Sequence, residues 1–246
     1  MQIAGTVAFV TGASGGIGRC LVSALLQRGA ARIYAADLPG KEFGDADPRV
    51  VPVGLDITDE QSVARAAAIA SDVQILINNA GVNLRAPFIS APSIASARRE
   101  IETNYLGTLA MCRAFAPILA AHHERDGSAI VNIASILGKV TLPNLGSYCA
   151  SKAALLRLSE GVRAELATQS TLVIVALPWA VDTAMSGPFA GEKTAPAEVA
   201  ERVMDAIASG DEEVVLHRYS AELERRLRSE PKQLEKELAA TFRSAP

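Results

Sequence analysis

The sequence has few of the features that mark secreted, metal-binding or nucleic-acid-binding proteins. Its three cysteines are an odd number without metal-ligand spacing, so we expect reduced thiols packed mostly in the core. The three histidines show no metal-ligand spacing either, and no metal site is expected. The formal net charge is only -3, and no block of lysine and arginine stands out. A nucleic-acid partner is therefore not expected, because such binding relies on clustered cations.

Long hydrophobic runs are also missing. The longest strongly apolar stretch, residues 171–181, is too short to span a bilayer and contains Pro178. The first predicted strand begins almost at once, without the basic region that opens a signal peptide. We expect a cytoplasmic protein with no membrane partner.

What the sequence does contain is an alternation of apolar strands and amphipathic helices. Hydrophobic residues make up 49% of the chain, which is ample for a buried core. Near-continuous apolar strands that alternate with helices indicate a parallel sheet covered on both faces. Strands are predicted at residues 6–10, 33–36, 50–53, 73–77, 129–134, 172–177 and 213–216, and the main helices at 58–70, 93–121, 147–167 and 196–209. The helix at 93–121 is unusually long, and a local irregularity is expected at Asn104 and Gly107.

The first strand, a glycine-rich turn and the next strand form the order that a dinucleotide site requires. The turn contains Gly12, Gly16 and Gly18, and it leads into a helix. Glycine lets the backbone approach a pyrophosphate, whose charge lies at the N-terminus of that helix. Asp37 follows Gly18 by 19 residues, close to the spacing of the carboxylate that binds the adenosine ribose. The sequence therefore predicts nucleotide binding.

Several polar or small residues fall just past strand ends. In an open parallel sheet the ligand crevice lies outside the carboxyl ends of the strands, so these residues should gather along one edge. They are Gly12, Asp37, Asp56, Asn79, Ser135 and Pro178.

Tyr148 and Lys152 lie one helical turn apart on the same face of a predicted helix. A cation close to a phenol favours the phenolate and lowers its pKa, which suits proton exchange with an alcohol or carbonyl near neutral pH. Ser135, at a strand end, is placed to hold the same oxygen. Taken alone, the pair fits equally well with an ordinary amphipathic helix carrying two snorkelling side chains.

Together these motifs resemble the short-chain dehydrogenase/reductase family across about residues 3–210. The matching motifs are Thr-Gly-x-x-x-Gly-x-Gly at residues 11–18, Asn-Asn-Ala-Gly at residues 78–81, Asn104, Ser135 and Tyr-x-x-x-Lys at residues 148–152. The resemblance implies a single Rossmann-type, doubly wound α/β domain of about seven parallel strands over residues 1–246. Its core would be residues 3–210, and residues 211–246 would form an atypical short strand and a charged helical tail.

The resemblance also implies a catalytic tetrad of Asn104, Ser135, Tyr148 and Lys152. In the family the tyrosine acts as acid and base, and the serine orients the substrate oxygen. The lysine binds the nicotinamide ribose and lowers the tyrosine pKa, while the asparagine holds a water of a proton relay. The implied reaction is hydride transfer between nicotinamide C4 and the carbon that bears the reacting oxygen.

The predicted cofactor is NAD. A carboxylate at Asp37 accepts hydrogen bonds from the ribose hydroxyls and repels a 2′-phosphate. The phosphate form would favour a cation near the turn, but Gly15 precedes Gly16, and Arg19 is as readily an outward-facing helix residue. The expected cofactor-binding residues are Gly12, Ser14, Gly16, Ile17, Gly18, Asp37, Leu38, Asp56, Ile57, Asn79, Ala80, Gly81, Tyr148, Lys152, Pro178, Val181 and Thr183.

The predicted substrate is a neutral, largely hydrophobic secondary alcohol or ketone, because no arginine or lysine is obviously placed for an anion. Trp179 replaces the glycine that is usual in the family, and it is expected either in the core or at the pocket wall. Residues 183–194 form either a mobile lid or a plain surface loop. The expected substrate residues are Ile136, Leu137, Leu142, Leu145, Trp179, Met185 and Phe189.

The C-terminal residues differ from those of many relatives. An apolar stripe along residues 220–242 is interrupted at Pro231 and is expected to pack on its own subunit or on a partner. The stripe consists of Leu223, Leu227, Leu234 and Leu238. Helices 93–121 and 147–167 are expected to pair across a two-fold axis, so a homodimer is predicted, with a tetramer kept open.

The sequence leaves three alternatives to this function. They are an NADP-dependent carbonyl reductase of the same family, an epimerase or dehydratase that uses bound NAD+ transiently, and a dinucleotide sensor without turnover. Epimerases and dehydratases on related scaffolds have a different glycine spacing and a large C-terminal substrate domain. The complete tetrad argues against the sensor.

Overall fold

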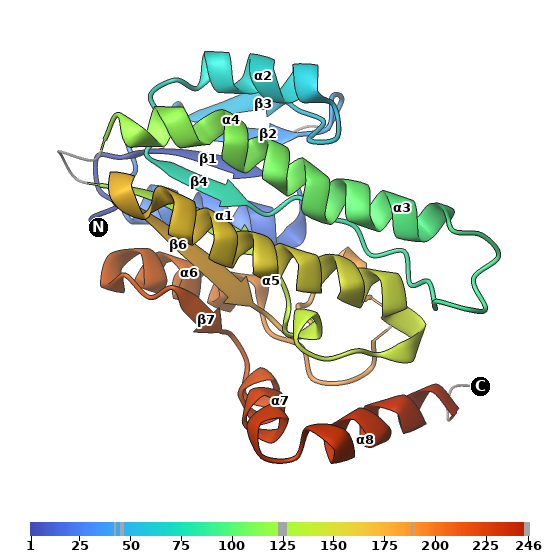
Figure 1. The fold of residues 1–246 in the computed structure, drawn as a ribbon. Coiled ribbons are helices and arrows are strands. Elements are labelled where there is room, and N and C mark those ends of the chain that lie inside the picture. Colours follow the sequence, from blue (N-terminus) through green and yellow to red (C-terminus); the bar gives the residue numbers. More distant parts are fainter. Residues whose placement is uncertain (42, 45–46, 123–126, 188, 244–246) are drawn as a thin grey trace.

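The computed structural model describes residues 1–246 except 42, 45–46, 123–126, 188 and 244–246. Seven parallel strands form one sheet in the order β3-β2-β1-β4-β5-β6-β7 (Figure 1). The predicted doubly wound α/β fold is therefore confirmed. The strands are β1 Val7–Thr11, β2 Arg32–Asp37, β3 Val50–Gly54, β4 Ile75–Asn78, β5 Ser128–Ile133, β6 Thr171–Leu177 and β7 Glu213–Val215.

Helices cover both faces of the sheet because its central strands are apolar on both sides. Every residue of β4 and β5 is buried. Helices α1 (Gly16–Gln27) and α6 (Pro196–Ser209) pack together on one face. Helices α2 (Glu60–Ile69), α4 (Thr108–Ala120) and α5 (Gly146–Leu166) cover the other, where α4 and α5 cross in front of the strands in Figure 1. Among the described residues, no helix is both long and apolar enough to cross a membrane.

The direction of winding reverses between β1 and β4. Strand β1 pairs with β2 on one side and with β4 on the other. The chain leaves these neighbouring strands in opposite directions, which opens a crevice beyond their carboxyl ends. The fold thus places the turn after β1 opposite the turn after β4.

The helix predicted at residues 93–121 is divided by a change of helical pitch. It consists of α3 (Ala95–Ile101), a π-helical turn (Glu102–Gly107) and α4. The irregularity expected at Asn104 and Gly107 is therefore confirmed. A Cβ at Gly107 would lie 2.8 Å from the Ile57 side chain, so only glycine allows this close approach.

The C-terminal tail forms two helices, α7 (Arg218–Ser229) and α8 (Pro231–Arg243), that pack on their own chain (Figure 1). Pro231 is the first residue of α8, a position where its missing N–H has no helical partner to lose. The apolar stripe faces inward, with Leu223, Leu234 and Leu238 buried and Leu227 partly buried. Of the two alternatives expected for this stripe, the structure shows packing on its own subunit.

Candidate active site

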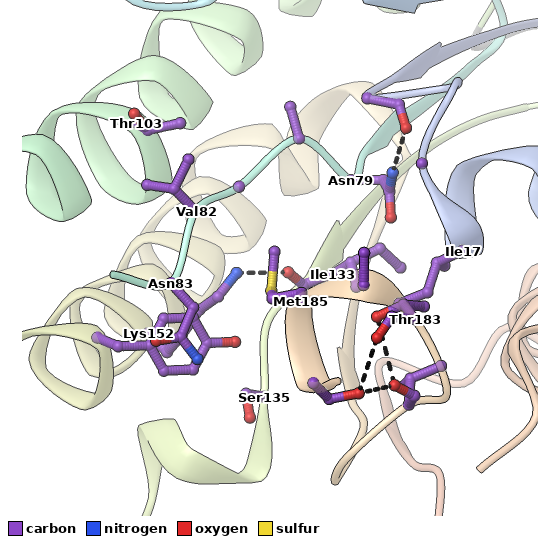
Figure 2. A pocket seen from close by; sticks show the side chains of 18 of the residues that line it. Ile17, Asn79, Val82, Asn83, Thr103, Ile133, Ser135, Lys152, Thr183 and Met185 are labelled. Atoms are coloured by element: carbon purple, nitrogen blue, oxygen red, sulfur yellow. Dashed lines mark hydrogen bonds between the residues drawn. The ribbon is translucent and has the colours of Figure 1, made fainter. Parts of the chain in front are cut away.

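A cleft of about 1390 Å³ lies at the carboxyl ends of the strands. The glycine turn after β1, the ends of β2, β4, β5 and β6, and the first turns of α5 all contribute to its wall (Figure 2). The cleft brings together nearly all the residues that the sequence predicted for the site. The exceptions are Gly18, Asn104 and Ile136.

The glycine turn depends on close backbone contacts. Gly12 has φ +62°, and a Cβ there would lie 2.9 Å from the Ala80 Cα. A Cβ at Gly16 would lie 2.6 Å from Thr183, across the cleft. Gly18 does not line the cleft, because it lies beneath the turn, where a Cβ would come within 2.2 Å of the Gly12 carbonyl oxygen. Gly18 thus supports the turn from beneath, and its contact with the cofactor stays a prediction.

The end of β2 is tied to this turn through Asp37. One carboxylate oxygen accepts hydrogen bonds from the Ser14 N–H (2.9 Å) and the Ser14 hydroxyl, and the other accepts one from the Leu38 N–H (2.8 Å). A carboxylate has about four acceptor positions, so three are in use. Room for two ribose hydroxyls would require the Ser14 hydroxyl to turn aside.

The segment after β4 is locked to the segment after β1. The Asn79 amide donates to the carbonyl oxygens of Thr11 and Gly12, both at 3.0 Å. The Thr11 hydroxyl accepts from the N–H groups of Asn79 and Ala80 at the same distance. Ala80 and Gly81 then line the cleft, and Asp56 and Ile57 line it after β3. These residues line the nucleotide channel, the part of the cleft in which the sequence predicts the dinucleotide.

Tyr148, Lys152 and Ser135 lie together where this channel meets the apolar part of the cleft. The Lys152 ammonium donates to the Ile133 carbonyl (2.9 Å) and lies 5.8 Å from the Tyr148 ring centroid (Figure 2). The Ser135 hydroxyl accepts from the Leu137 N–H (3.1 Å) and donates to the Pro178 carbonyl (3.3 Å). One buried phenol, one hydroxyl and one ammonium thus share one end of the cleft.

Burial governs the protonation of this group. It raises the pKa of Tyr148 above its ordinary value, although the Ser135 hydroxyl acts in the opposite direction. It lowers the pKa of Lys152 to about 8. The net direction for the Tyr148 pKa is thus upward, and the loss of water around the phenol is its largest cause. The lowering of the Tyr148 pKa by Lys152 stays a prediction.

Asn104 is buried and does not face the cleft. Its side-chain oxygen accepts from the Val82 N–H (2.8 Å), and its amide donates to the Val82 carbonyl and the Ser151 hydroxyl, both at 2.9 Å. These side-chain hydrogen bonds all go to protein groups, and the water-holding role stays a prediction. In the structure Asn104 joins the loop after β4 to helix α5.

The apolar part of the cleft contains six of the seven predicted substrate residues: Leu137, Leu142, Leu145, Trp179, Met185 and Phe189. Ile136 is the exception, because it is fully buried in the cluster formed with the tail leucines. The Trp179 ring lies edge-on to Phe189 (centroids 5.8 Å apart) and to Tyr219 of α7 (4.7 Å). Residues 183–194 therefore meet the tail at Trp179; Pro188 lies outside the described residues.

The sequence did not indicate the polar groups at the mouth of the cleft. Arg85, in the loop after β4, has φ +54° and donates to the Met185 carbonyl (2.8 Å). Arg98, Arg99 and Lys41 also line the cleft. The sequence showed no arginine or lysine obviously placed for an anion, whereas these four cationic side chains line the cleft. These residues belong to no motif, and only the fold brings them to the mouth.

Comparison with known proteins agrees with this arrangement. Residues 6–193 match the family model described as short chain dehydrogenase. A short chain dehydrogenase from Burkholderia cenocepacia J2315, solved in complex with NADP, is 45% identical with a TM-score of 0.92, over 97% of this chain and 99% of that one. A cis-4-hydroxycyclohexanecarboxylate dehydrogenase from Sinomonas cyclohexanicum is 36% identical over 187 residues, 72% of this chain and 74% of the relative. A Burkholderia phymatum short chain dehydrogenase/reductase in complex with NAD is 23% identical with a TM-score of 0.84, over 95% and 96% of the two chains, which shows the fold alone.

Proposed function

This chain belongs to the short-chain dehydrogenase family, and from that premise we propose that it is an NAD-dependent oxidoreductase acting on secondary alcohols and ketones. The observation that carries the proposal is the placement of Tyr148, Ser135 and Lys152 where the nucleotide channel meets the apolar cleft. Nicotinamide, when bound, supplies or accepts a hydride at the substrate carbon. Asp37, the glycine turn and residues 79–81 would hold the dinucleotide.

The residues of the chain account for the proton that accompanies the hydride. During alcohol oxidation the hydroxyl proton passes to the Tyr148 oxygen, and during ketone reduction the phenol returns it. The Ser135 hydroxyl orients the reacting oxygen, and the Lys152 ammonium favours the phenolate form when it is charged. Asn104 contributes by fixing Val82, which lines the cleft beside Gly81.

NAD is the proposed cofactor because the Asp37 carboxylate lies at the end of β2, where it would repel a 2′-phosphate. NADP is the second candidate. It is supported by the NADP complex of the relative from B. cenocepacia and by Lys41, a cation that lines the same part of the cleft as Leu38.

The proposed substrate is a largely hydrophobic secondary alcohol or ketone, since leucine, tryptophan, phenylalanine and methionine side chains surround the apolar part of the cleft. A hydroxy acid is a second candidate. Arg85 at the mouth offers a planar set of donors that suits a carboxylate, and the relative from S. cyclohexanicum is named for such a substrate. Comparison of cyclohexanol with 4-hydroxycyclohexanecarboxylate in wild type and Arg85→Gln would separate the two.

A homodimer remains the proposed assembly. Ile101, Tyr105 and Leu109 are partly exposed along the long helical segment, and Ala150 and Ala164 are exposed on α5. Cys112, further along the same helical segment, is buried in the core of its own subunit. Light scattering at micromolar concentration tests the assembly, and a monomeric mass would refute it.

The test of the proposed activity is the appearance or loss of NADH and NADPH absorbance across a panel of secondary alcohols and ketones. Wild type should turn over at least one compound, with NADH favoured over NADPH. A protein that binds NADH but reacts with no member of the panel would support the non-catalytic sensor instead.

A further inference from the structure

Glu100 is a fully buried acidic residue that no part of the proposed mechanism uses. Its relative exposure is 0%, and Glu100 and Lys152 are the buried charged residues in the described part of the chain. Lys152 lies one helical turn from Tyr148, and Glu100 accepts a hydrogen bond from Ser147, the residue before Tyr148. Burying a carboxylate is costly, so a carboxylate kept in such a place is a candidate for a functional role.

The two oxygens of Glu100 bind two segments that flank the site. Oε1 accepts from the Leu84 N–H (2.7 Å), in the loop between β4 and α3. Oε2 accepts from the hydroxyl of Ser147, the residue just before Tyr148. Both donors are neutral. One side chain on α3 therefore joins the loop at the mouth of the cleft to the first turn of α5.

Asn104 makes the same pair of connections one turn further along. It binds Val82 of the loop and Ser151 of α5, as Glu100 binds Leu84 and Ser147. Ser147 and Ser151 are four residues apart and so share one face of α5. Tyr148 lies between these two attachment points. Glu100 is thus the second of two parallel links that hold the catalytic helix and the loop together.

The position also suits a negative charge. Helix α5 has 21 residues, and it begins at Gly146 with no side-chain cap and no acidic residue in its first turn. The N-terminus of a helix carries partial positive charge and unpaired N–H groups. Glu100 brings a carboxylate to this end from another helix.

We infer that Glu100 is a positioning residue for the proposed reaction: through Ser147 and Leu84 it fixes Tyr148 relative to the loop that lines the cleft, and it brings a negative charge to the end of α5 that carries Tyr148. This inference rests on the proposed function. It names no contact between Glu100 and the reacting atoms, so the residue acts through Tyr148.

The direction of the charge effect follows from electrostatics. A negative charge near a phenol disfavours the phenolate, and Glu100 acts to raise the pKa of Tyr148. Ser135 opposes this shift through its hydroxyl. The ionisable or charged groups on the elements packed around Tyr148 are Lys152, Cys149, Glu100 and Lys139. Lys139 forms ion pairs with Glu213 of β7 and Glu224 of α7.

Two substitutions separate position from charge. Glu100→Gln keeps an oxygen for the Leu84 N–H and an amide that donates to the Ser147 hydroxyl, but it removes the charge. We expect a near-normal maximal kcat and a pH profile of alcohol oxidation moved to lower pH by about 0.5–1 unit.

Glu100→Asp keeps the charge but is one methylene shorter. We expect an unmoved pH profile and a kcat lowered about tenfold, because the phenol is misplaced. Glu198→Gln, at an exposed glutamate of α6, is the control and should change neither quantity.

Titration of Tyr148 by ultraviolet difference spectroscopy, with Tyr148→Phe as the blank, gives a readout that needs no turnover. A lower phenol pKa in Glu100→Gln supports the inference even if no substrate is found. If wild type turns over an alcohol but Glu100→Gln has the profile and titration of wild type, the inference fails and the proposed function stands. If no alcohol reacts, the proposed function fails, and the titration alone decides the role of Glu100. Glu100→Gln and Glu100→Asp could instead lose thermal stability equally while kcat and the pH profile stay those of wild type. Glu100 would then be a structural residue only, and the inference would be overturned.

Discussion

The nucleotide side and the substrate side of the cleft are built in different ways. The nucleotide side consists of turns that follow β1, β2, β3 and β4, and polar side chains of these turns, such as Asp37 and Asn79, bind the backbone of a neighbouring turn. The substrate side combines residues 136–145, residues 178–190 and a tail that begins at residue 218. Side chains from three distant parts of the sequence have to meet before that wall exists.

This difference indicates where each side can vary. On the nucleotide side a change in one glycine acts directly on the backbone that faces the ligand. On the substrate side the tail leucines do not line the cleft, yet they pack against Ile136, Leu137 and Tyr148, which hold it in shape. Cofactor binding and substrate recognition should therefore respond to different substitutions.

Among substitutions that act on one side of the cleft, the largest effect is expected from Gly18→Ala on the nucleotide side. The new Cβ would come within 2.2 Å of the Gly12 carbonyl oxygen, so the turn has to move. We expect a loss of about 3 kcal/mol in the free energy of unfolding and at least a tenfold weaker NADH affinity, measured by urea unfolding and fluorescence titration. Gly161→Ala on α5 is the control, because a Cβ there meets nothing within 4 Å. Normal NADH affinity in Gly18→Ala would contradict the role given to the turn.

Leu234→Ala in α8 should cause a comparable loss of stability, but it should weaken binding of the alcohol and not of NADH. This side chain is 1% exposed and packs in the cluster that includes Tyr148. We expect about 3 kcal/mol lower stability and a raised KM for the alcohol, with unchanged NADH affinity. Leu227→Ala, at a partly buried position of the same stripe, should have a smaller effect. Equal weakening of NADH and alcohol binding would show that the two sides are not separable.

The sequence predicted the nucleotide side almost completely, because that side depends on local patterns. Apolar strands, glycine spacing and a well-placed Asp37 determine the turn, and the rule that ligands lie at strand ends gathers the rest. Even the irregularity near Asn104 was indicated by an asparagine and a glycine within a long helical pattern. Tyr148 and Lys152 were found because both lie on one helix.

The substrate side could not be predicted to the same depth, since its contacts are long-range. Glu100 appears in the sequence as an ordinary charged helix residue, and only the packing of α3 on α5 buries it. Arg85 donates to the carbonyl of Met185, which lies 100 residues further along the chain. Ile136 was placed in the wall by its position after β5, but the tail draws it into the core.

A smaller, selective effect on the nucleotide side is expected from Asp37→Asn. Loss of the charge removes the repulsion of a 2′-phosphate but keeps acceptors and donors for ribose. We expect the ratio of kcat/KM for NADH over NADPH to fall about tenfold, with little change in the alcohol KM. An unchanged ratio would assign cofactor choice to another residue, with Lys41 the first to examine.

A further predicted effect is a pH dependence of stability that originates where the two sides meet. Burial lowers the pKa of Lys152 from 10.5 to about 8, so between these values the unfolded chain binds more protons than the folded one. Stability should therefore rise with pH in this window, by about 2 kcal/mol from about pH 7.5 to about pH 9.5 beyond that of a Lys152→Met variant. The raised pKa of Tyr148 acts in the opposite direction only above its ordinary titration range near pH 10. Urea unfolding of wild type and Lys152→Met at both pH values measures this change. An equal rise in the free energy of unfolding of the two proteins would contradict the lowered pKa of Lys152.

The most direct test of the central claim is isotope transfer from NADH deuterated at nicotinamide C4 to a ketone. Wild type should place deuterium on the carbinol carbon of the product. Tyr148→Phe should bind the same NADH with wild-type affinity and transfer deuterium about 10²–10⁴-fold more slowly, because only the proton donor is missing. Product without deuterium, or a Tyr148→Phe rate within tenfold of wild type, would contradict the account.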